Sequence, residues 1–382
     1  MTRIKVLFLT SGLGVGGAER MLQKLIMASR QLEPNEIDFI VVSLRSRELV
    51  GIQLESNGIS VEYLGLNSGI IRFFQGLSKL ISIYRRDIDL VQSWMYHADF
   101  LASLFKMLFP RKPLIWGLRN STLSLKGSSY SSIIIRTALV PLSYLIPSLI
   151  VSCSKNAISQ HIAIGFNKSL FEHIPNGIEK NQYLNQFHKN IARKKVIQAK
   201  LGVDMLVGMV GRFDAQKNFE GFFEVAGMIA REDPSVGFIL QGTNIAENKV
   251  LVDLARNNGI ETKCLLLDFS DDVRDLYQCL DAHLLTSLFG EGFPNVIIES
   301  VACGVKNFVF DVGDNDSIAP DEMVTVCDSS FDMAHKVNQF LREGPSNNFC
   351  RERFNHFIIN NYSITYVFDR YLRSYRRVLN AE

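Results

Sequence analysis

The hydrophobic pattern alternates along the chain between short apolar runs and longer segments in which apolar residues recur at helical spacing. A first series of such runs extends from residue 4 to about residue 177, and a second begins at Leu206. Short runs without polar alternation are typical of strands buried on both faces of a parallel sheet. The helical segments between them indicate crossover helices. The pattern therefore predicts an α/β protein with two parallel sheets.

The expected elements follow directly from these runs. Strands of the first sheet are predicted at Lys5–Thr10, Ile37–Leu44, Ser60–Leu64, Leu90–Trp94, Pro113–Leu118, Leu149–Cys153 and Phe171–Ile174. Helices are expected near residues 18–31, 70–85, 98–108, 130–145 and 154–164. Strands of the second sheet are predicted at Leu206–Val210, Val236–Leu240, Cys264–Asp268, Ala282–Ser287, Asn307–Phe310 and Met323–Cys327.

A strong turn signal, Pro175-Asn176-Gly177, separates the two series. We therefore place one domain at residues 1–177 and a second at residues 178–358. From Tyr362 to Leu379 the apolar residues again recur at helical spacing, which predicts an amphipathic tail helix that packs on either domain.

Composition narrows the class of protein. The 382 residues include 41 Lys and Arg against 39 Asp and Glu, which argues against a protein held to nucleic acid by net charge. Six scattered cysteines without a C-x-x-C pair indicate free thiols in a reducing compartment. The most apolar region, Ile133 to Val151, is interrupted by Arg136, Pro141 and Pro147, so a membrane-spanning helix is not expected. We expect a cytoplasmic protein.

The first candidate site is the stretch Glu291-Gly292-Phe293-Pro294-Asn295, which follows a predicted strand and opens a predicted helix with Pro294 at its first position. The first-turn amides and the helix dipole favour an anion such as a diphosphate. Glu291 and Glu299 would accept hydrogen bonds from the hydroxyl groups of a sugar and a ribose. A nucleotide sugar combines these groups. The alternative is a solvated turn carboxylate and a satisfied helix carboxylate.

The second candidate site is a glycine loop after the first strand, Gly12-Leu13-Gly14-Val15-Gly16-Gly17, with the spacing G-x-G-x-x-G. Dinucleotide-binding loops also need an acid after the next strand, and Ser43-Leu44-Arg45 supplies none. An NADP-linked oxidoreductase with Arg45 at the 2′-phosphate is one alternative, and a simple tight turn is another. We favour a loop that lets ligand groups approach the backbone at the mouth of a domain cleft.

Further candidates follow other predicted strands. Arg212 and Lys217 lie after the first strand of the second domain, where cations suit a diphosphate leaving group, although two solvated loop charges would look the same. His97 follows the fourth strand, and Arg119-Asn120 follows the fifth, with structural roles as the alternative. Asp314-Asn315-Asp316 has metal-binding spacing but lies in a Gly- and Asp-rich loop that favours a turn.

Taken together, these residues resemble retaining glycosyltransferases of the GT-B fold, in particular glycosyltransferase family four, the glycosyl transferases group 1. The resemblance rests on Gly16-Gly17-Ala18-Glu19, His97, Pro175-Asn176-Gly177-Ile178, Gly211-Arg212, Lys217-Asn218, Glu291-Gly292-Phe293-Pro294-Asn295 and Glu299. It implies an α/β protein with the GT-B fold, in which two Rossmann-like, doubly wound parallel-sheet domains face a central cleft. It also implies that residues 359–382 form a helix that returns to the N-terminal, acceptor-side domain.

The resemblance implies roles for individual residues. The catalytic residues would be Arg212 and Lys217, which bind the diphosphate, with Glu291 and His97 at the transferred sugar. Donor-binding residues would be Gly16, Gly17, Gly211, Arg212, Lys217, Glu291, Gly292, Phe293, Pro294, Asn295, Val296 and Glu299, the last holding the ribose. Acceptor-binding residues would be Trp94, His97, Arg119 and Asn120. Departures at Gln241-Gly242-Thr243-Asn244 and at Asp268 leave the nucleotide base unassigned.

The function implied is that of a retaining, metal-independent hexosyltransferase. It would move a sugar from a nucleotide sugar, with UDP-sugars favoured, to a glycan or lipid-linked acceptor in the biosynthesis of a surface polysaccharide such as O-antigen, capsule or lipopolysaccharide. No cofactor besides this co-substrate and no nucleic-acid partner is expected. The alternatives are an NADP-linked oxidoreductase, a non-catalytic GT-B scaffold, and a metal-free epimerase or phosphorylase with the same fold.

The segment Ile70 to Arg86 is apolar with basic residues, and Arg111-Lys112 follows the next predicted helix. Such a segment suits peripheral contact with the cytoplasmic face of an anionic membrane. An ordinary sheet-covering helix with a cationic end accounts for it equally well.

Overall fold

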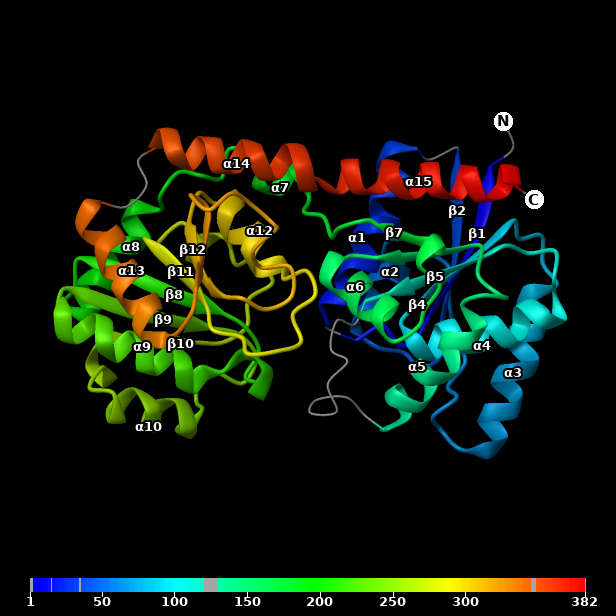
Figure 1. Cartoon of the computed structure of the whole chain (residues 1–382), viewed down its shortest axis with the longest axis horizontal. Coiled ribbons are helices and arrows are strands. Elements are labelled where there is room, and N and C mark those ends of the chain that lie inside the picture. The colour runs from blue at the N-terminus through cyan, green and yellow to red at the C-terminus, as the bar shows by residue number, and fades with distance from the viewer. Residues whose placement is uncertain (1–2, 15, 34–35, 120–129, 345–347, 382) are drawn as a thin grey trace. The chain divides into compact units, whose positions relative to one another are not determined.

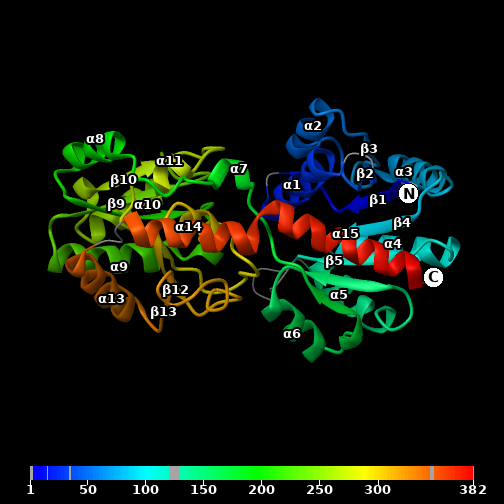
Figure 2. The same ribbon diagram turned by 90° about the horizontal axis from the view of Figure 1, so that it is seen from above.

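The computed structural model describes residues 3–14, 16–33, 36–119, 130–344 and 348–381. It consists of two compact α/β units (Figures 1 and 2). The first unit comprises Met1–Gly177 together with Ile364–Glu382, and the second comprises Ile178–Ser363.

The first unit contains a sheet of seven strands in the order β3-β2-β1-β4-β5-β6-β7, and every neighbouring pair is parallel. Its strands are β1 (Ile4–Thr10), β2 (Ile37–Ser43), β3 (Val61–Tyr63), β4 (Leu90–Trp94), β5 (Leu114–Leu118), β6 (Leu149–Ser152) and β7 (Phe171–His173). The central strands are buried on both faces, which explains their continuous apolar runs.

Helices cover both faces of this sheet. One apolar cluster joins α1 (Gly17–Leu32), α2 (Leu49–Ser56) and the tail helix α15 (Ile364–Ala381) to the sheet. A second cluster on the sheet joins α3 (Ile70–Tyr84), α4 (Tyr96–Leu108) and α5 (Tyr130–Leu142). The helix α6 (Lys155–Ala163) and the 3-10 turn η1 (Lys168–Leu170) lie between β6 and β7.

The tail helix α15 packs on the first unit, beside α1 (Figure 2). Its buried side chains Val367, Tyr371 and Tyr375 belong to the core of that unit. The helix begins at Ile364 rather than at residue 359, because α14 (Asn348–Tyr362) stays in the second unit and Ser363 pairs with Ile178 there.

The second unit contains six parallel strands in the order β10-β9-β8-β11-β12-β13. They are β8 (Met205–Val210), β9 (Val236–Gln241), β10 (Cys264–Leu267), β11 (Ala282–Leu285), β12 (Lys306–Phe310) and β13 (Val324–Cys327). An apolar cluster packs α9 (Phe219–Glu232), α10 (Lys249–Asn257) and α13 (Ser330–Glu343) on this sheet. The remaining elements are α7 (Lys180–Tyr183), α8 (Ile191–Leu201), α11 (Arg274–Tyr277), α12 (Asn295–Ala302) and the 3-10 turns η2 (Ala215–Lys217) and η3 (Glu261–Lys263).

The sequence pattern predicted all thirteen of these strands, with differences of a few residues at their ends. Among the helices of the first unit it missed α2, because Leu49–Ser56 is a short segment in which Leu49 and Ile52 are exposed although they are apolar. All six cysteines carry free thiols. No helix in the described ranges has the length and apolar character needed to cross a membrane.

Each sheet has one point at which the strand order reverses, between β1 and β4 in the first unit and between β8 and β11 in the second. Ligands of open α/β sheets bind beyond the carboxyl ends of the strands at such a point. The glycine loop and His97 follow β1 and β4. Residues 211–218 and 286–294 follow β8 and β11, so the predicted candidates lie at both reversal points.

Candidate active site

The centre of the candidate site in the second unit is an ion pair between Lys217 and Glu291. Lys217 Nζ lies 2.6 Å from Glu291 Oε1, and the two side chains are only 16% and 7% exposed. Ser287 Oγ donates a second hydrogen bond of 2.7 Å to the same carboxylate oxygen. The structure thus brings together two of the predicted catalytic residues, which lie 74 positions apart in the sequence.

Lys217 is held by the turn that connects β8 to α9. Asp214 caps η2 by accepting a hydrogen bond from the Gln216 amide, and Asn218 caps α9 by accepting one from the Gly221 amide. Asn218 adopts a left-handed backbone (φ 50°), a conformation that asparagine tolerates better than most residues. Thr286 Oγ1 donates to the carbonyl oxygen of Lys217 at 3.0 Å, so the turn is tied to the end of β11.

The loop that follows β12 packs against the backbone of Glu291 and Gly292. Gly313 has a left-handed backbone (φ 69°), and a Cβ atom there would lie 2.1 Å from the carbonyl oxygen of Glu291. The Asp314 amide donates to the Gly292 carbonyl at 3.1 Å. The sequence predicted a turn at Asp314-Asn315-Asp316, and the Ser317 amide closes that turn on the Asp314 carbonyl.

The helix α12 begins one residue later than predicted. Pro294 has an extended backbone and lies at the N-cap rather than at the first helical position, a difference within the usual uncertainty of helix ends. Phe293 and Pro294 are buried, and the Phe293 ring packs against Tyr362 at 5.3 Å between centroids. Phe293 would therefore meet a donor through its backbone rather than through its side chain.

The other end of α12 is anchored by α14. Arg351 is almost fully buried, and its Nη2 donates to the carbonyl oxygen of Cys303 at 2.8 Å, just past the end of the helix. Desolvation lowers the pKa of Arg351 to about 10, so it keeps its charge at neutral pH. A cation suits this carboxyl end, because the helix dipole leaves partial negative charge there.

The remaining donor-side candidates surround this pair. Gly211 lies under the side chain of Lys217, with a Cβ position 3.6 Å from Lys217 Cδ. Arg212 Nη2 bonds to Asp214 Oδ2 at 3.1 Å, and its side chain is 62% exposed, so most of its donors face solvent. Glu299 is half-buried on α12, which follows Gly292 and has Val296 in its first turn.

In the first unit the glycine loop binds a carboxylate of the chain itself. The Leu13 amide donates to Glu48 Oε2 at 2.6 Å, and Arg45 Nη1 lies 3.9 Å from Glu48 Oε1. Gly16 and Gly17 begin α1, with Gly16 at the N-cap. A fixed carboxylate on this loop would repel a dinucleotide pyrophosphate and also engages Arg45. This arrangement disfavours the NADP-linked alternative.

His97 lies in the first turn of α4, after a strained residue. Met95 has φ 74° and ψ 154°. Residues other than glycine rarely adopt this backbone conformation, and such strained residues cluster at functional sites. The His97 ring is half-buried, and desolvation together with Arg45 lowers its pKa below the usual value. A neutral imidazole at physiological pH both donates and accepts hydrogen bonds, as sugar hydroxyl groups require.

The structure gives Trp94 and Arg119 internal contacts. The Arg119 guanidinium lies 3.5 Å from the centroid of the Trp94 ring, donates to Asn176 Oδ1 at 3.0 Å, and bonds to the Tyr371 hydroxyl. Trp94 Nε1 donates to the Ala18 carbonyl. These contacts join β4, β5 and α15. Asn120 lies outside the described residues.

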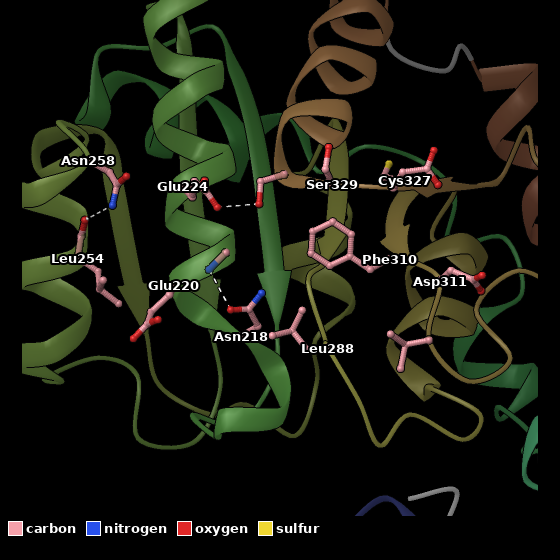
Figure 3. Close-up of a pocket in the computed structure, with 14 residues that line it drawn as sticks. Asn218, Glu220, Glu224, Leu254, Asn258, Leu288, Phe310, Asp311, Cys327 and Ser329 are labelled. Carbon is pink, nitrogen blue, oxygen red and sulfur yellow. Dashed lines mark hydrogen bonds between the residues drawn. The ribbon is translucent and has the colours of Figure 1, made fainter. Parts of the chain in front are cut away.

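A separate cavity of about 880 Å³ lies where β12 and β13 end and α9 and α13 begin (Figure 3). Four carboxylates line it, and the described lining residues include no lysine or arginine. The carboxylates are those of Glu220, Glu224, Asp311 and Asp328. A cavity of this charge would repel a diphosphate, so the candidate donor site is the neighbouring turn with Lys217 rather than this cavity.

Several residues of the site were missed in the sequence. Ser287 and Thr286 were treated as the end of a strand, although their hydroxyl groups hold Glu291 and Lys217. A pair of hydroxyl residues where a buried parallel strand ends is the signal that would have found them. Gly313 and Glu48 act through contacts between distant segments, for which the sequence carries no local signal.

Comparison with known proteins finds a family match in the second unit and a fold likeness over the whole chain. Residues 191–356, within the second unit, match the sequence model of the family described as glycosyl transferases group 1. No curated protein sequence matches the chain. The structure of Alr3699/HepE from Anabaena in complex with UDP is similar to the chain, with a TM-score of 0.80 and 19% identity over 97% of this chain and 99% of that chain.

Two other solved structures show the same likeness. Sucrose-phosphate synthase from Thermosynechococcus elongatus has a TM-score of 0.76 and 13% identity, over 99% of this chain and 100% of that chain. The apo form of the lipopolysaccharide outer core galactosyltransferase WaaB has a TM-score of 0.70 and 15% identity, over 97% of this chain and 99% of that chain. The chain has the GT-B fold. Its second unit is a glycosyl transferases group 1 domain, so the chain carries a glycosyltransferase domain.

Proposed function

We propose that the chain is a retaining glycosyltransferase that moves a hexose from a nucleotide sugar to a glycan or lipid-linked acceptor during the biosynthesis of a surface polysaccharide. The observation that carries the proposal is the Lys217–Glu291 pair at the strand-order reversal of a glycosyl transferases group 1 domain. A cation for a leaving diphosphate and an acceptor for sugar hydroxyl groups are adjacent there, beside the first turn of α12.

Lys217 and Glu291 can each form further hydrogen bonds to a donor besides the one between them. An ammonium has three donor hydrogens, and Lys217 uses one on Glu291, which leaves two for diphosphate oxygens. No described side chain bonds to Glu291 Oε2, so this oxygen is available to a sugar hydroxyl. Arg212 adds an exposed guanidinium on the same loop, and Glu299 is assigned to the ribose.

In the proposed reaction, the bond between the anomeric carbon and the diphosphate oxygen breaks, and the diphosphate leaves with the electron pair. The acceptor hydroxyl oxygen bonds to the anomeric carbon on the same face, and its proton passes to an oxygen of the leaving phosphate. Lys217 and Arg212 stabilise the charge that grows on the diphosphate. Fixed donors of this kind are usually the largest single contribution to catalysis.

UDP is the nucleotide we favour for the donor. Alr3699/HepE, which shares the fold, has been solved with UDP and with UDP-glucose. WaaB, which also shares it, is a galactosyltransferase of the lipopolysaccharide outer core. We assign the acceptor to the first unit, with His97 nearest the reacting sugar, and propose that the protein works at the cytoplasmic face of the membrane.

A transfer assay with labelled UDP-hexoses and lipid-linked or oligosaccharide acceptors tests the proposal. We expect the product to keep the anomeric configuration of the donor and turnover to survive EDTA. Lys217→Ala and Arg212→Ala should each lower the rate by about 100- to 1000-fold while the fold persists. Near-normal turnover in either variant, with the circular dichroism spectrum unchanged, would remove the diphosphate assignment.

A further inference from the structure

A cavity of about 330 Å³ beside α3 in the first unit contains none of the predicted site residues. Among its described lining residues there are three cations and no carboxylate. The side chains that give it this character are those of Arg47, Arg72, Lys79, Ser46, Ser68 and Gln75. A small cavity with cations and hydroxyl groups suits a phosphate group.

The cations of this cavity are only partly neutralised. Arg47 bonds to Glu55, and Lys79 Nζ lies 2.7 Å from Glu62 Oε2. Arg72 has no hydrogen-bond or ionic partner within the described ranges, so its guanidinium is available to a ligand. The spacing of Arg72, Gln75 and Lys79 places all three on one side of α3.

The walls of the cavity are fixed by close packing. At Gly76 a Cβ atom would lie 2.6 Å from the carbonyl oxygen of Leu64, so α3 is pressed against the loop that follows β3. The helix α3 and the chain around Leu64 therefore form two closely packed walls of the cavity.

The first two turns of α3 also expose large apolar side chains, on a side of the helix that adjoins the one with Arg72, Gln75 and Lys79. Ile70, Ile71 and Phe74 are 74%, 73% and 63% exposed. The helix α4 lies beside α3 (Figure 1). Its side chains Met107 and Leu108 are 55% and 66% exposed. A group of neighbouring apolar side chains that are exposed to solvent is typical of a surface that binds a partner.

Charge is distributed very unevenly along the chain. Residues 64–171, which contain α3, α4 and α5, hold twelve Lys and Arg but only three Asp and no Glu, whereas the whole chain has 41 cations against 39 anions. The cations are Arg72, Lys79, Arg85, Arg86, Lys106, Arg111, Lys112, Arg119, Lys126, Arg136, Lys155 and Lys168. Exposed apolar groups among basic residues complement an anionic bilayer, which has negatively charged headgroups over an apolar interior.

We propose that Ile70, Ile71 and Phe74, together with the cavity side chains Arg72 and Lys79, form an α3 surface that docks on an anionic phospholipid bilayer. The apolar side chains enter the headgroup region, and a lipid phosphate binds beside Arg72. The α3 surface deepens the proposed function, because a lipid-linked acceptor would be presented there, but docking itself does not depend on sugar transfer.

Co-sedimentation of the full chain with phosphatidylcholine vesicles, with and without phosphatidylglycerol, tests this proposal. We expect binding only with phosphatidylglycerol and a strong decrease at high salt. Arg72→Gln should bind about fivefold more weakly, since a cation near such a surface contributes on the order of 1 kcal/mol. The double variant Ile71→Ser with Phe74→Ser should bind at least about tenfold more weakly, because it loses most of the inserted apolar area.

The matched control is Phe331→Ser, which removes a phenylalanine that is 73% exposed on α13 in the second unit, and it should bind as the wild type does. UDP should raise the melting temperature of every variant equally, which separates a failure of docking from a failure of the donor site. Equal binding of the wild type and the α3 variants overturns the proposal, as does equal binding to neutral and anionic vesicles.

Inorganic phosphate distinguishes a lipid from a free anion. If phosphate alone raises the melting temperature of the wild type, leaves that of Arg72→Gln unchanged, and no vesicle binds, the cavity takes a soluble phosphate and membrane docking is overturned. If phosphate has no such effect and phosphatidylglycerol vesicles bind, the lipid assignment stands.

Discussion

At the scale of single residues, Glu291 has different surroundings at its two carboxylate oxygens. Oε1 is engaged by Lys217 and Ser287, whereas Oε2 is bonded to no described side chain. Glu291→Gln should therefore weaken donor binding and also slow the chemical step, since it alters the charge beside Lys217. Glu299→Gln should mainly weaken donor binding. Steady-state kinetics check this: kcat falls for Glu291→Gln only, and an equal fall in kcat for both variants would contradict the separate roles.

The close contact between Gly313 and the backbone of Glu291 predicts that a side chain at Gly313 lowers both stability and activity. Gly313→Ala would place a Cβ atom 2.1 Å from the Glu291 carbonyl oxygen at a left-handed position, so the loop must move. We expect a loss of stability of about 1–3 kcal/mol, measured by urea unfolding, with a fall in kcat. Gly259→Ala is the matched control, because Gly259 is also left-handed (φ 74°) but a Cβ atom there would meet nothing within 4 Å. If both variants lose the same activity, Gly313 does not position Glu291.

The buried His283 predicts how the stability of the second unit depends on pH. Its ring accepts from the Val210 amide, bonds to Asn307 Oδ1 and packs on Tyr277, and desolvation lowers its pKa to about 4. In the unfolded chain the ring titrates near pH 6.5, so the unfolded state binds more protons between these values. The contribution of His283 to the free energy of unfolding is therefore greatest above pH 6.5. It falls by about 3 kcal/mol as the pH drops to 4.

The loss of stability can be measured by amide hydrogen exchange at β11 across this pH range. His283→Gln should flatten the pH dependence, although it lowers stability at pH 7, whereas His335→Gln at an exposed position should leave the dependence unchanged. A pH dependence that persists in His283→Gln would show that another group is responsible.

At the scale of the elements, α15 is fastened to the first unit by polar contacts as well as apolar ones. Arg119 stacks on Trp94 and bonds to Tyr371 and Asn176. Arg119→Ala should destabilise the first unit by roughly 2–4 kcal/mol, because it removes a stacked cation and leaves the buried Tyr371 hydroxyl without its donor. If Arg119→Ala instead raises the KM for the acceptor at unchanged stability, its acceptor-binding role is correct.

The strands were predictable because burial on both faces makes each one a continuous apolar run, as in β9 and β11. The motif loops were predictable because they follow those strands at the carboxyl edge of each sheet. The bond between Lys217 and Glu291 was not, because it joins segments 74 positions apart. The internal contacts of Trp94, Arg119 and Phe293 were also not predictable, since motif spacing does not say which way a side chain points.

At the scale of the whole molecule, two doubly wound units each place candidate residues at the reversal of their strand order. The second carries the cation and carboxylate expected for a donor, in the part that matches glycosyl transferases group 1. The first carries a glycine loop that binds Glu48, a half-buried His97, and the cationic helix α3. We propose that the second unit binds the donor and that the first unit binds the acceptor.

Lys217 and Glu291 together are proposed to hold the nucleotide sugar. The most direct test is calorimetric titration of UDP and UDP-hexoses, with NADPH in parallel, into the wild type and Lys217→Ala. We predict that the UDP ligands bind the wild type and bind Lys217→Ala at least about tenfold more weakly, because a charge-assisted contact is lost, whereas NADPH binds neither. Binding of NADPH alone, or UDP affinity unchanged in Lys217→Ala, would contradict the assignment of the donor site to Lys217 and Glu291.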